Sequence, residues 1–348
     1  MAQLRRVTYT YKTLRGVAYC ADVYLRPEEE LNEGHRKGAP VLVYYHGGGM
    51  CAGNRGWNDW VGKWLFYDAL NAGFIVISFD YTLISPDTAF QIIEDVKDGM
   101  LWIRDQLNQC LVEDTCLRVD PGRIAVSGAS GGGCLAYYAA LYSPIKLRAI
   151  LAFYAEGGDF LSPWYLKEKT EPFFLGLPLL TEFEPYEALR DAAPDSPPEN
   201  WTDIGWSGNH RNEYFYYLLQ TAQAVDVFAG CKGLSKALVE LPADQRPAAV
   251  PDEARPILPP LNITPSFPPI YLLHGVQDTA VSIEESRNMY KALKEAGVED
   301  VKLWEVEGGE HGFDTDGWYG GPGGQDPVLT RKRNEALKGV IPWVVERT

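Results

Sequence analysis

Residues 123–133 read RIAVSGASGGG, a run that begins with β-branched residues and ends with a serine among glycines. Residues 134–141 (CLAYYAAL) continue with the small and apolar side chains of a buried helix. This order predicts a strand, a tight turn and a helix, with Ser130 on the turn. Gly128 and Gly132 flank the serine in the pattern G-x-S-x-G, in which the glycines let neighbouring backbone approach and the hydroxyl stays exposed. The start of the helix adds free amides that favour an anion beside the serine.

The same turn has a second interpretation, as a phosphate-binding turn. Residues 128–133 could bind the pyrophosphate of NAD(P), as in a short-chain reductase. Two further features favour this alternative: Glu156 closes the next predicted strand, where a ribose-binding acid belongs, and Tyr290 and Lys294 form Y-x-x-x-K on a predicted helix. The motif alone does not separate the two interpretations, so the rest of the chain has to decide.

The length and composition of the sequence are typical of a globular protein with a large core. A chain of 348 residues with 46% hydrophobic and 23% charged residues allows one large α/β domain or two smaller ones. The net charge of −15 argues against nucleic acid and anionic membranes as partners, because both would repel the protein. No apolar run reaches the about 20 residues of a membrane-spanning helix.

Two smaller features concern location and cofactors. Residues 1–7 (MAQLRRV) are not followed by the apolar stretch of a signal peptide, so we expect a cytoplasmic protein. The cysteines form no C-x-x-C pair and no Cys/His metal spacing. We therefore expect six reduced thiols, no metal and no organic cofactor.

The first half of the chain has the pattern of an α/β protein. Two leading strands, at residues 7–11 and 17–25, are expected to pair antiparallel around a turn. Buried strands then alternate with helices, which predicts a mostly parallel central sheet with helices on both faces. The expected strands are residues 40–45, 74–80, the stretch before Ser130 and 147–154, and the expected helices are residues 57–70, 90–107 and the one after Ser130.

A long insert interrupts this alternation. Residues 157–267 are rich in proline and aromatic residues and have one short helical segment near residues 212–225. Because so long a stretch is rarely plain loop, we expect a lid or cap at 157–267 between the core segments 1–156 and 268–348. Regular order then resumes with strands at 270–275 and 301–306 and with helices at 284–296 and 327–345.

A second glycine motif, HGGG at residues 46–49, follows an early strand. With this loop and the G-x-S-x-G turn, the chain resembles α/β-hydrolases of the hormone-sensitive-lipase type over most of residues 40–156 and 268–345. Residues 80–86 (DYTLISP) are also similar to the D-Y-R-L-A-P stretch of that family. The resemblance implies the α/β-hydrolase fold and an oxyanion hole formed by the amides of Gly48, Gly49 and Gly131. His46 is expected to brace the loop.

A serine nucleophile needs an imidazole to take its proton and a carboxylate to orient that imidazole. Three histidines follow Ser130: His210 in the insert, His274 in or at the end of a strand, and His311 on a glycine-bracketed loop after the last strand. His311 is favoured because ligands bind at that edge of the sheet, and Asp278 holds the corresponding loop one strand earlier. The weaker candidates for the acid are Glu156, Asp314 and Asp316.

The sequence departs from that family at several positions, so the resemblance implies the fold but not the substrate. Ala129 and Gly131 stand where an acidic residue and an alanine are usual, and no helical N-terminal cap precedes the first strand. The stretch from Asp278 to Val281 is more similar to the D-x-x-V of prolyl-oligopeptidase relatives. The substrate of the lipase branch is therefore not carried over to this chain.

The elements together favour a serine esterase over the reductase. A reductase turn follows the first strand, whereas several strands precede Ser130, and that alternative leaves the HGGG loop and His311 unexplained. We expect Ser130, His311 and Asp278 to cleave small to medium apolar or aromatic esters, with specificity set by the aromatic insert. Amidase, lactonase and acyltransferase reactions use the same groups, and the sequence does not separate them or indicate an oligomeric state. The aromatic residues of the insert are Trp164, Tyr165, Phe173, Phe174, Phe183, Tyr186, Trp201, Trp206, Tyr214, Phe215, Tyr216 and Tyr217.

Overall fold

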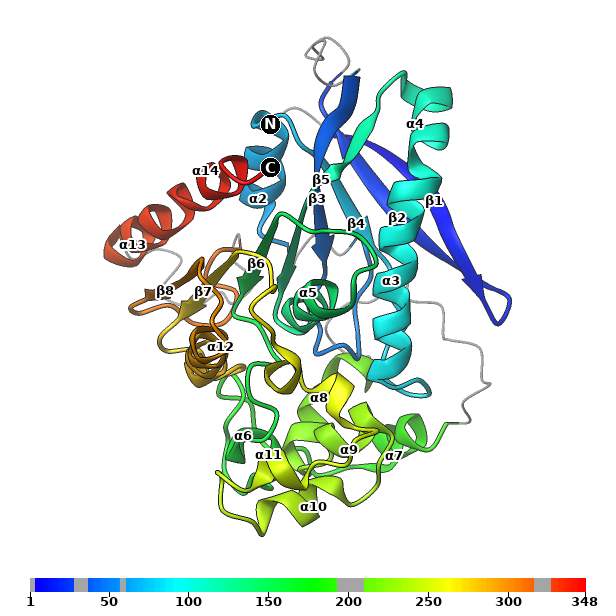
Figure 1. Ribbon diagram of the computed structural model, residues 1–348. Coiled ribbons are helices and arrows are strands. Elements are labelled where there is room, and N and C mark those ends of the chain that lie inside the picture. Colours follow the sequence, from blue (N-terminus) through cyan, green and yellow to red (C-terminus); the bar gives the residue numbers. More distant parts are fainter. Residues whose placement is uncertain (1–3, 28–36, 57–60, 193–209, 316–326) are drawn as a thin grey trace.

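An eight-stranded sheet forms the centre of the protein in the computed structural model (Figure 1). The structure describes residues 4–27, 37–56, 61–192, 210–315 and 327–348. The strand order in the sheet is β1-β2-β4-β3-β5-β6-β7-β8. The strands are β1 (Arg5–Leu14), β2 (Val17–Leu25), β3 (Ala39–Tyr45), β4 (Ile75–Phe79), β5 (Val119–Ala129), β6 (Ala149–Phe153), β7 (Ile270–Gly275) and β8 (Val301–Val306).

The pairing of the strands follows their burial. Strands β3 to β8 pair in parallel with one another, whereas β2 pairs antiparallel with both β1 and β4. The central strands β3, β4 and β6 are buried at every residue, because helices cover both faces of a parallel sheet. Edge strand β1 alternates between intermediate and exposed residues over most of its length. The chain therefore has the expected α/β-hydrolase fold.

Two hydrophobic clusters lie on the two faces of the sheet. The larger cluster joins the sheet to α3 (Ala89–Asp105), α4 (Leu107–Thr115), α5 (Gly131–Tyr142) and α12 (Ile283–Glu295). The smaller cluster joins the opposite face to α2 (Lys63–Asn71), α13 (Pro327–Lys338) and α14 (Val340–Val345). Because α5 is packed between the sheet and other helices, the turn that carries Ser130 rests on a rigid support.

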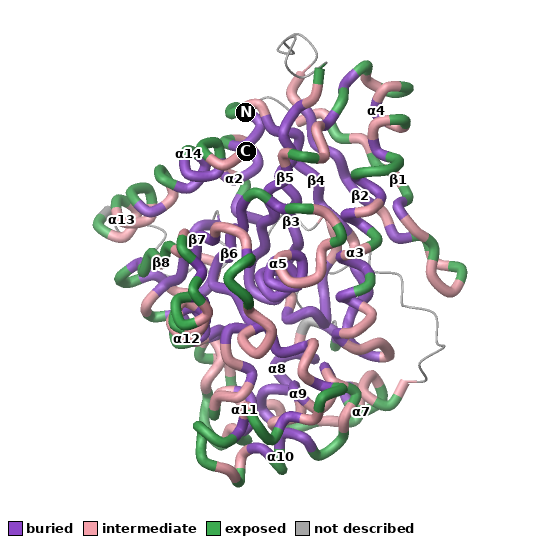
Figure 2. The backbone as a smooth tube through the Cα atoms, in the orientation of Figure 1, coloured by how far each residue is buried: buried purple, intermediate pink, exposed green. Residues whose placement is uncertain are grey.

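The described residues of the insert, 157–192 and 210–267, include a group of short helices at one end of the sheet (Figure 1). Helix α9 contacts α3, and the rings of α8 join the larger hydrophobic cluster. In Figure 2 most of the described residues of α8 are buried, α9 has both buried and intermediate residues, and α10 includes exposed ones. The helices are α6 (Pro163–Leu166), α7 (Glu184–Arg190), α8 (His210–Gln220), α9 (Ala224–Ala229), α10 (Leu234–Val239), α11 (Arg246–Ala249), η3 (Arg255–Ile257) and η4 (Pro259–Asn262).

Several expected helix boundaries were wrong. The helix expected at 327–345 is two helices separated at Gly339, and α4 had not been expected as a separate helix. The helix expected at 57–70 begins at Lys63, with residues 57–60 outside the described part of the chain. The single helical segment expected near 212–225 is two helices, α8 and α9, among several others in the insert.

None of the helices in the described residues has the length and apolar character needed to cross a membrane. All six cysteines are free thiols.

Candidate active site

Ser130 occupies a strained turn between β5 and α5. Its backbone has φ 56° and ψ −126°, a region that non-glycine residues rarely adopt and that the surrounding packing must enforce. The two flanking glycines allow that packing: a Cβ on Gly128 would overlap the carbonyl of Gly132, and a Cβ on Gly132 would overlap the carbonyl of Tyr45. The serine hydroxyl therefore stands at the end of the strand, with its side chain held in one place by backbone on both sides.

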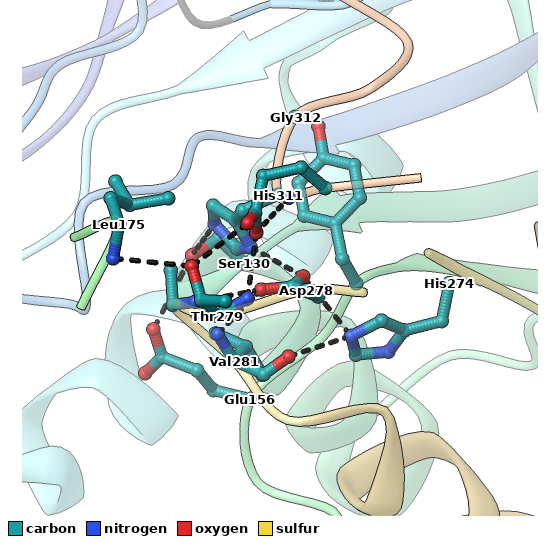
Figure 3. A network of polar contacts seen from close by, with 12 residues as sticks. Ser130, Glu156, Leu175, His274, Asp278, Thr279, Val281, His311 and Gly312 are labelled. Atoms are coloured by element: carbon teal, nitrogen blue, oxygen red, sulfur yellow. Dashed lines mark hydrogen bonds and ion pairs between the residues drawn. The ribbon is translucent and has the colours of Figure 1, made fainter. Parts of the chain in front are cut away.

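The structure brings Ser130, His311 and Asp278 into one hydrogen-bonded chain (Figure 3). His311 Nε2 lies 3.0 Å from Ser130 Oγ, and His311 Nδ1 lies 2.8 Å from Asp278 Oδ2. A carboxylate can only accept, so Nδ1 carries the proton and Nε2 faces the serine as an acceptor. All three side chains are mostly buried. The imidazole is therefore oriented to take the serine proton.

Asp278 is held by four hydrogen bonds. Its Oδ1 accepts from the amides of Ala280 and Val281, at 2.9 and 2.8 Å. Its Oδ2 accepts from His311 and also lies 3.2 Å from His274 Nε2. The amides of the short turn after β7 thus hold the carboxylate in place. The fixed carboxylate can therefore orient His311, which lies on the loop after the next strand.

His274 is a neighbour of the candidate triad and not its base. Its Nε2 also lies 2.9 Å from the carbonyl oxygen of Val281, and its Nδ1 lies 2.7 Å from Ser286 Oγ. Because the carbonyl and the Asp278 carboxylate only accept, Nε2 carries the proton and Nδ1 accepts from the serine hydroxyl. His274 therefore donates to the same carboxylate oxygen as His311.

The charges of the site favour an imidazolium next to a carboxylate. Burial opposes the ionisation of Asp278, but the charge of His311 and the hydrogen bonds from both histidines hold the pKa of Asp278 below its usual range. Burial likewise lowers the pKa of His311, yet the facing Asp278 carboxylate outweighs it and raises the pKa of His311 above its ordinary value. The pair thus stabilises the protonated imidazole that forms when a serine loses its proton.

The HGGG loop lies directly against the turn of Ser130. A Cβ on Gly131 would be 2.9 Å from the amide nitrogen of Gly49, and a Cβ on Gly47 would be 3.3 Å from Ser130 Cβ. Gly48 and Gly49 have φ of 102° and 60°. Among the described residues, no hydrogen bond takes up the N–H groups of Gly48, Gly49 or Gly131. These amides are free to bind an oxyanion close to the serine.

The stacked rings of His46 and Tyr81 support the HGGG loop. His46 stacks on Tyr81 with ring centroids 4.2 Å apart, and the Tyr81 hydroxyl donates to the His46 carbonyl at 2.8 Å. His46 Nδ1 lies 2.8 Å from the carbonyl of Gly47, and burial lowers the pKa of His46 to about 4. His46 is therefore a neutral, stacked residue, in line with the bracing role expected of it.

The other candidate residues have different surroundings. Asp314 accepts from Tyr154 and Trp64, each at 2.8 Å, and Tyr154 packs edge-on against the ring of His311. Lys294 donates to the carbonyls of Val298 and Glu299, which follow α12. Tyr290, the other residue of the reductase alternative, packs against the larger core cluster. His210 is exposed on the insert, and Glu156 lies beside Ser130. Asp316 lies outside the described residues.

Sequence reasoning missed the contacts that tie the loops together. Glu310 accepts from the amide and hydroxyl of Thr279, at 2.6 and 2.8 Å, and from the amide of His311 at 2.8 Å. Thr279 Oγ1 in turn lies 3.2 Å from the amide of Leu175, which belongs to the insert (Figure 3). The buried Arg211 of α8 donates to the carbonyl of Cys51, shortly after the glycine loop, and to the carbonyl of Ile84. A glutamate beside the histidine was the only sequence signal for this network.

Comparison with known proteins indicates esterases. A family model described as BD-FAE, an α/β-hydrolase esterase family, matches residues 22–152. The chain is 26% identical to a "probable carboxylesterase M8" from a Phoma species over 320 residues, which is 90% of this chain and 91% of that protein. It is 30% identical to the "non-reducing polyketide synthase ausA" of Aspergillus calidoustus over 331 residues. That match covers 88% of this chain but only 13% of the synthase.

Solved structures support the fold in the same way. The esterase Est2 of Thermogutta terrifontis superposes with a TM-score of 0.56 at 18% identity, over 98% of this chain and 92% of that chain. A truncated carbohydrate esterase from gut microbiota gives a TM-score of 0.55 at 16% identity, over 98% and 96% of the two chains. The fold is thus shared with esterases, and the sequence is carboxylesterase-like.

Proposed function

We propose that this protein with the α/β-hydrolase fold is a serine carboxylesterase whose nucleophile is Ser130. The observation that carries the proposal is the hydrogen-bonded chain from Ser130 through His311 to Asp278, formed beside free amides of a glycine loop. Its residues come from three distant parts of the sequence. An incidental contact between a serine and a histidine would not also include an orienting carboxylate and unused donors.

In the first half of the reaction, Ser130 Oγ attacks the carbonyl carbon of the ester while its proton passes to His311 Nε2. The carbonyl π electrons move onto oxygen and form a tetrahedral oxyanion. That intermediate collapses as the bond to the alkoxy oxygen breaks, and His311 returns the proton to the leaving alcohol. The product is an ester between the acyl group and Ser130.

In the second half, water takes the place of the alcohol. His311 accepts a proton from the water, whose oxygen attacks the acyl carbon. The bond to Ser130 Oγ then breaks, and the serine regains its proton from His311 as the carboxylic acid leaves. Asp278 keeps its charge throughout and stabilises the imidazolium in both halves.

The amides of Gly48, Gly49 and Gly131 would hold the oxyanion. They belong to the HGGG loop and to the first turn of α5, which lie against each other beside the serine, and they have no hydrogen-bond partner among the described residues. Donors of this kind act on charge that appears only in the transition state, so removing one typically costs about 3 kcal/mol of transition-state stabilisation.

Residues 157–267 would act as a cap over the site and select the substrate. Phe215 of α8 lies against Gly49, and Phe174 lies 6.3 Å from Phe215 between ring centroids. Leu175 contacts the Asp278 loop through Thr279. Rings at this position favour an apolar or aromatic acyl or alcohol group of small to medium size. Many other rings of the insert pack on one another, and Trp201 and Trp206 lie outside the described residues.

A fluorophosphonate probe tests the nucleophile. The probe should label the protein stoichiometrically, and peptide mapping should find the adduct on Ser130. Ser130→Ala should abolish both labelling and ester hydrolysis. Ser127→Ala is the matched control, because Ser127 lies on the same strand and its hydroxyl donates to a strand carbonyl instead of facing the histidine. Labelling that maps elsewhere, or that survives in Ser130→Ala, would refute the proposal.

The match to a polyketide synthase favours a second candidate, the release or transfer of an acyl group held as a thioester. The same Ser130 acyl-enzyme would form from a thioester, and either water or an alcohol would then take the acyl group. Comparing kcat/KM for an oxygen ester and an N-acetylcysteamine thioester of the same acyl group separates the two candidates. A large preference for the thioester would favour the second one.

A further inference from the structure

The strand next to the nucleophile ends in an acid that the proposed mechanism does not use. Glu156 follows β6, is 0% exposed, and has its Oε1 3.3 Å from Ser130 Oγ (Figure 3). Its backbone amide also donates to the carbonyl of Ser130 at 3.1 Å. Main chain and side chain thus both tie Glu156 to the serine, which leaves the carboxyl little freedom to turn away.

The serine hydroxyl has two possible acceptors and one proton. His311 Nε2 at 3.0 Å and Glu156 Oε1 at 3.3 Å both lie within hydrogen-bond distance of Ser130 Oγ. If Glu156 is ionised, both neighbours can only accept, so they compete for the serine proton. If Glu156 is protonated, its O–H donates to a lone pair of Oγ, and the serine proton is left for His311.

On the premise that the proposed esterase function is correct, we infer that Glu156 is a positioning residue. In its protonated form, its carboxyl group directs the Ser130 hydroxyl toward His311. It also holds Oγ in line for attack on the substrate. When Glu156 loses its proton, the serine donates to the carboxylate instead, and the nucleophile is separated from its base.

The surroundings of Glu156 keep the proton on it near neutral pH. Burial raises the pKa of Glu156 to about 8, against the opposing effect of His311 and of the bond to Ser130, and Asp278 raises it further. The second carboxyl oxygen, Oε2, has no hydrogen-bond partner among the described residues, which makes an ionised form more costly. Besides the candidate triad, the titratable groups around it are Cys51, Tyr81, Cys134, Tyr138, Tyr165 and Glu285.

These neighbours do not supply a cation for an ionised Glu156. Glu285 is itself a buried acid, and burial raises its pKa well above the usual range. The thiols and phenols around Glu156 likewise have pKa values raised by burial. Within the part of the chain that the structure describes, His311 is the one group facing Glu156 that can carry positive charge. Ionisation of Glu156 therefore affects both His311, through its charge, and Ser130, through the hydrogen bond of the hydroxyl.

The test is the pH dependence of kcat in three variants. For the natural protein, kcat should fall on the alkaline side to about one tenth of its plateau one pH unit above the pKa of Glu156. Glu156→Gln keeps a donor toward Ser130 but does not ionise, so its kcat should be within about threefold of the natural protein at pH 7 and level through the alkaline range. Glu156→Ala should lose at least tenfold in kcat at pH 7 with KM nearly unchanged.

The matched control is Glu285→Gln, the same substitution at another fully buried acid. Glu285 accepts from the amide of Asp159 at 2.9 Å and does not contact the serine. This variant should keep the alkaline decline even if its melting temperature changes. If Glu156→Gln shows the same decline as the natural protein, or Glu156→Ala keeps its kcat, the inference is wrong.

Fluorophosphonate labelling distinguishes this failure from failure of the proposed function. Labelling of Ser130 with an unchanged alkaline decline in Glu156→Gln would refute only the role of Glu156. Absence of labelling at Ser130 in the natural protein would refute the esterase proposal and the role of Glu156 with it.

Discussion

The substitution Gly49→Ala tests the role of the glycine loop at its close contact with Phe215. Gly49 has φ 60°, and a Cβ there would lie 2.6 Å from Cβ and Cδ1 of Phe215. Phe215 is 5% exposed and stacks on Phe228 with an interplanar angle of 5°. Because the ring is held in the core between insert and sheet, we expect the glycine loop to move instead of the ring.

The expected fall in kcat of Gly49→Ala follows from two free-energy costs. An alanine in the left-handed backbone region costs about 1–2 kcal/mol, which lowers the stability of the loop. Displacement of the loop removes the Gly49 amide from the oxyanion, and one lost donor of this kind costs about 3 kcal/mol, or about 10²-fold to 10³-fold in kcat. We therefore expect kcat to fall by at least about 10²-fold, with a smaller change in KM.

A double-mutant cycle separates the clash from the backbone strain. The rates of Gly49→Ala, Phe215→Ala and the double variant should be measured on a small acyl ester that does not need the ring for binding. Removing the ring should restore most of the kcat lost in Gly49→Ala, because only the backbone cost remains. If Gly49→Ala keeps the kcat of the natural protein, or if the double variant is as slow as Gly49→Ala, the assignment of Gly49 to the oxyanion hole is wrong.

Three further predictions concern the candidate triad and its loops. Asp278→Asn should lower kcat about 10⁴-fold, because the amide no longer fixes the proton on Nδ1 of His311, and a slowed rate of fluorophosphonate labelling would report the loss. On the acid side, kcat/KM should fall as pH drops through the pKa of His311, which the Asp278 carboxylate raises above its ordinary value, so the same variant should move this limb of the profile to lower pH. Glu310→Gln should reduce kcat about threefold to tenfold by loosening the loop before His311, with Gln109→Ala on α4 as a surface control, and an unchanged kcat would exclude a positioning role for Glu310.

The positions of Ser130, Asp278 and His311 could be predicted because each follows a strand of a parallel sheet. The carboxyl ends of such strands meet at one edge, so residues distant in sequence arrive at one place. The two glycine motifs were recognisable for a related reason: close approach of backbone leaves no room for a Cβ. The fold class was confirmed, whereas the roles of the three side chains and the oxyanion hole remain predictions.

The rest of the site could not be predicted because it depends on contacts between elements. The pairing of Glu310 with Thr279 joins two loops, and Arg211 of the insert donates to the carbonyl of Cys51, shortly after the glycine loop. Neither contact leaves a periodic pattern in the sequence. The helices in the described part of the insert have 3 to 11 residues, and most of them are too short to show the repeat of an amphipathic helix.

The shared oxygen of Asp278 extends the active site to the outer layer of the fold. Ser286 on α12 donates to His274, His274 donates to Asp278, and the carboxylate receives His311, which faces Ser130. Because Nε2 of His274 carries the proton, Nδ1 can only accept, and a Ser286 hydroxyl turned away from the ring would place an oxygen lone pair against the lone pair of Nδ1. The hydroxyl of Ser286 on a covering helix is thus linked to the candidate nucleophile Ser130 through His274, Asp278 and His311.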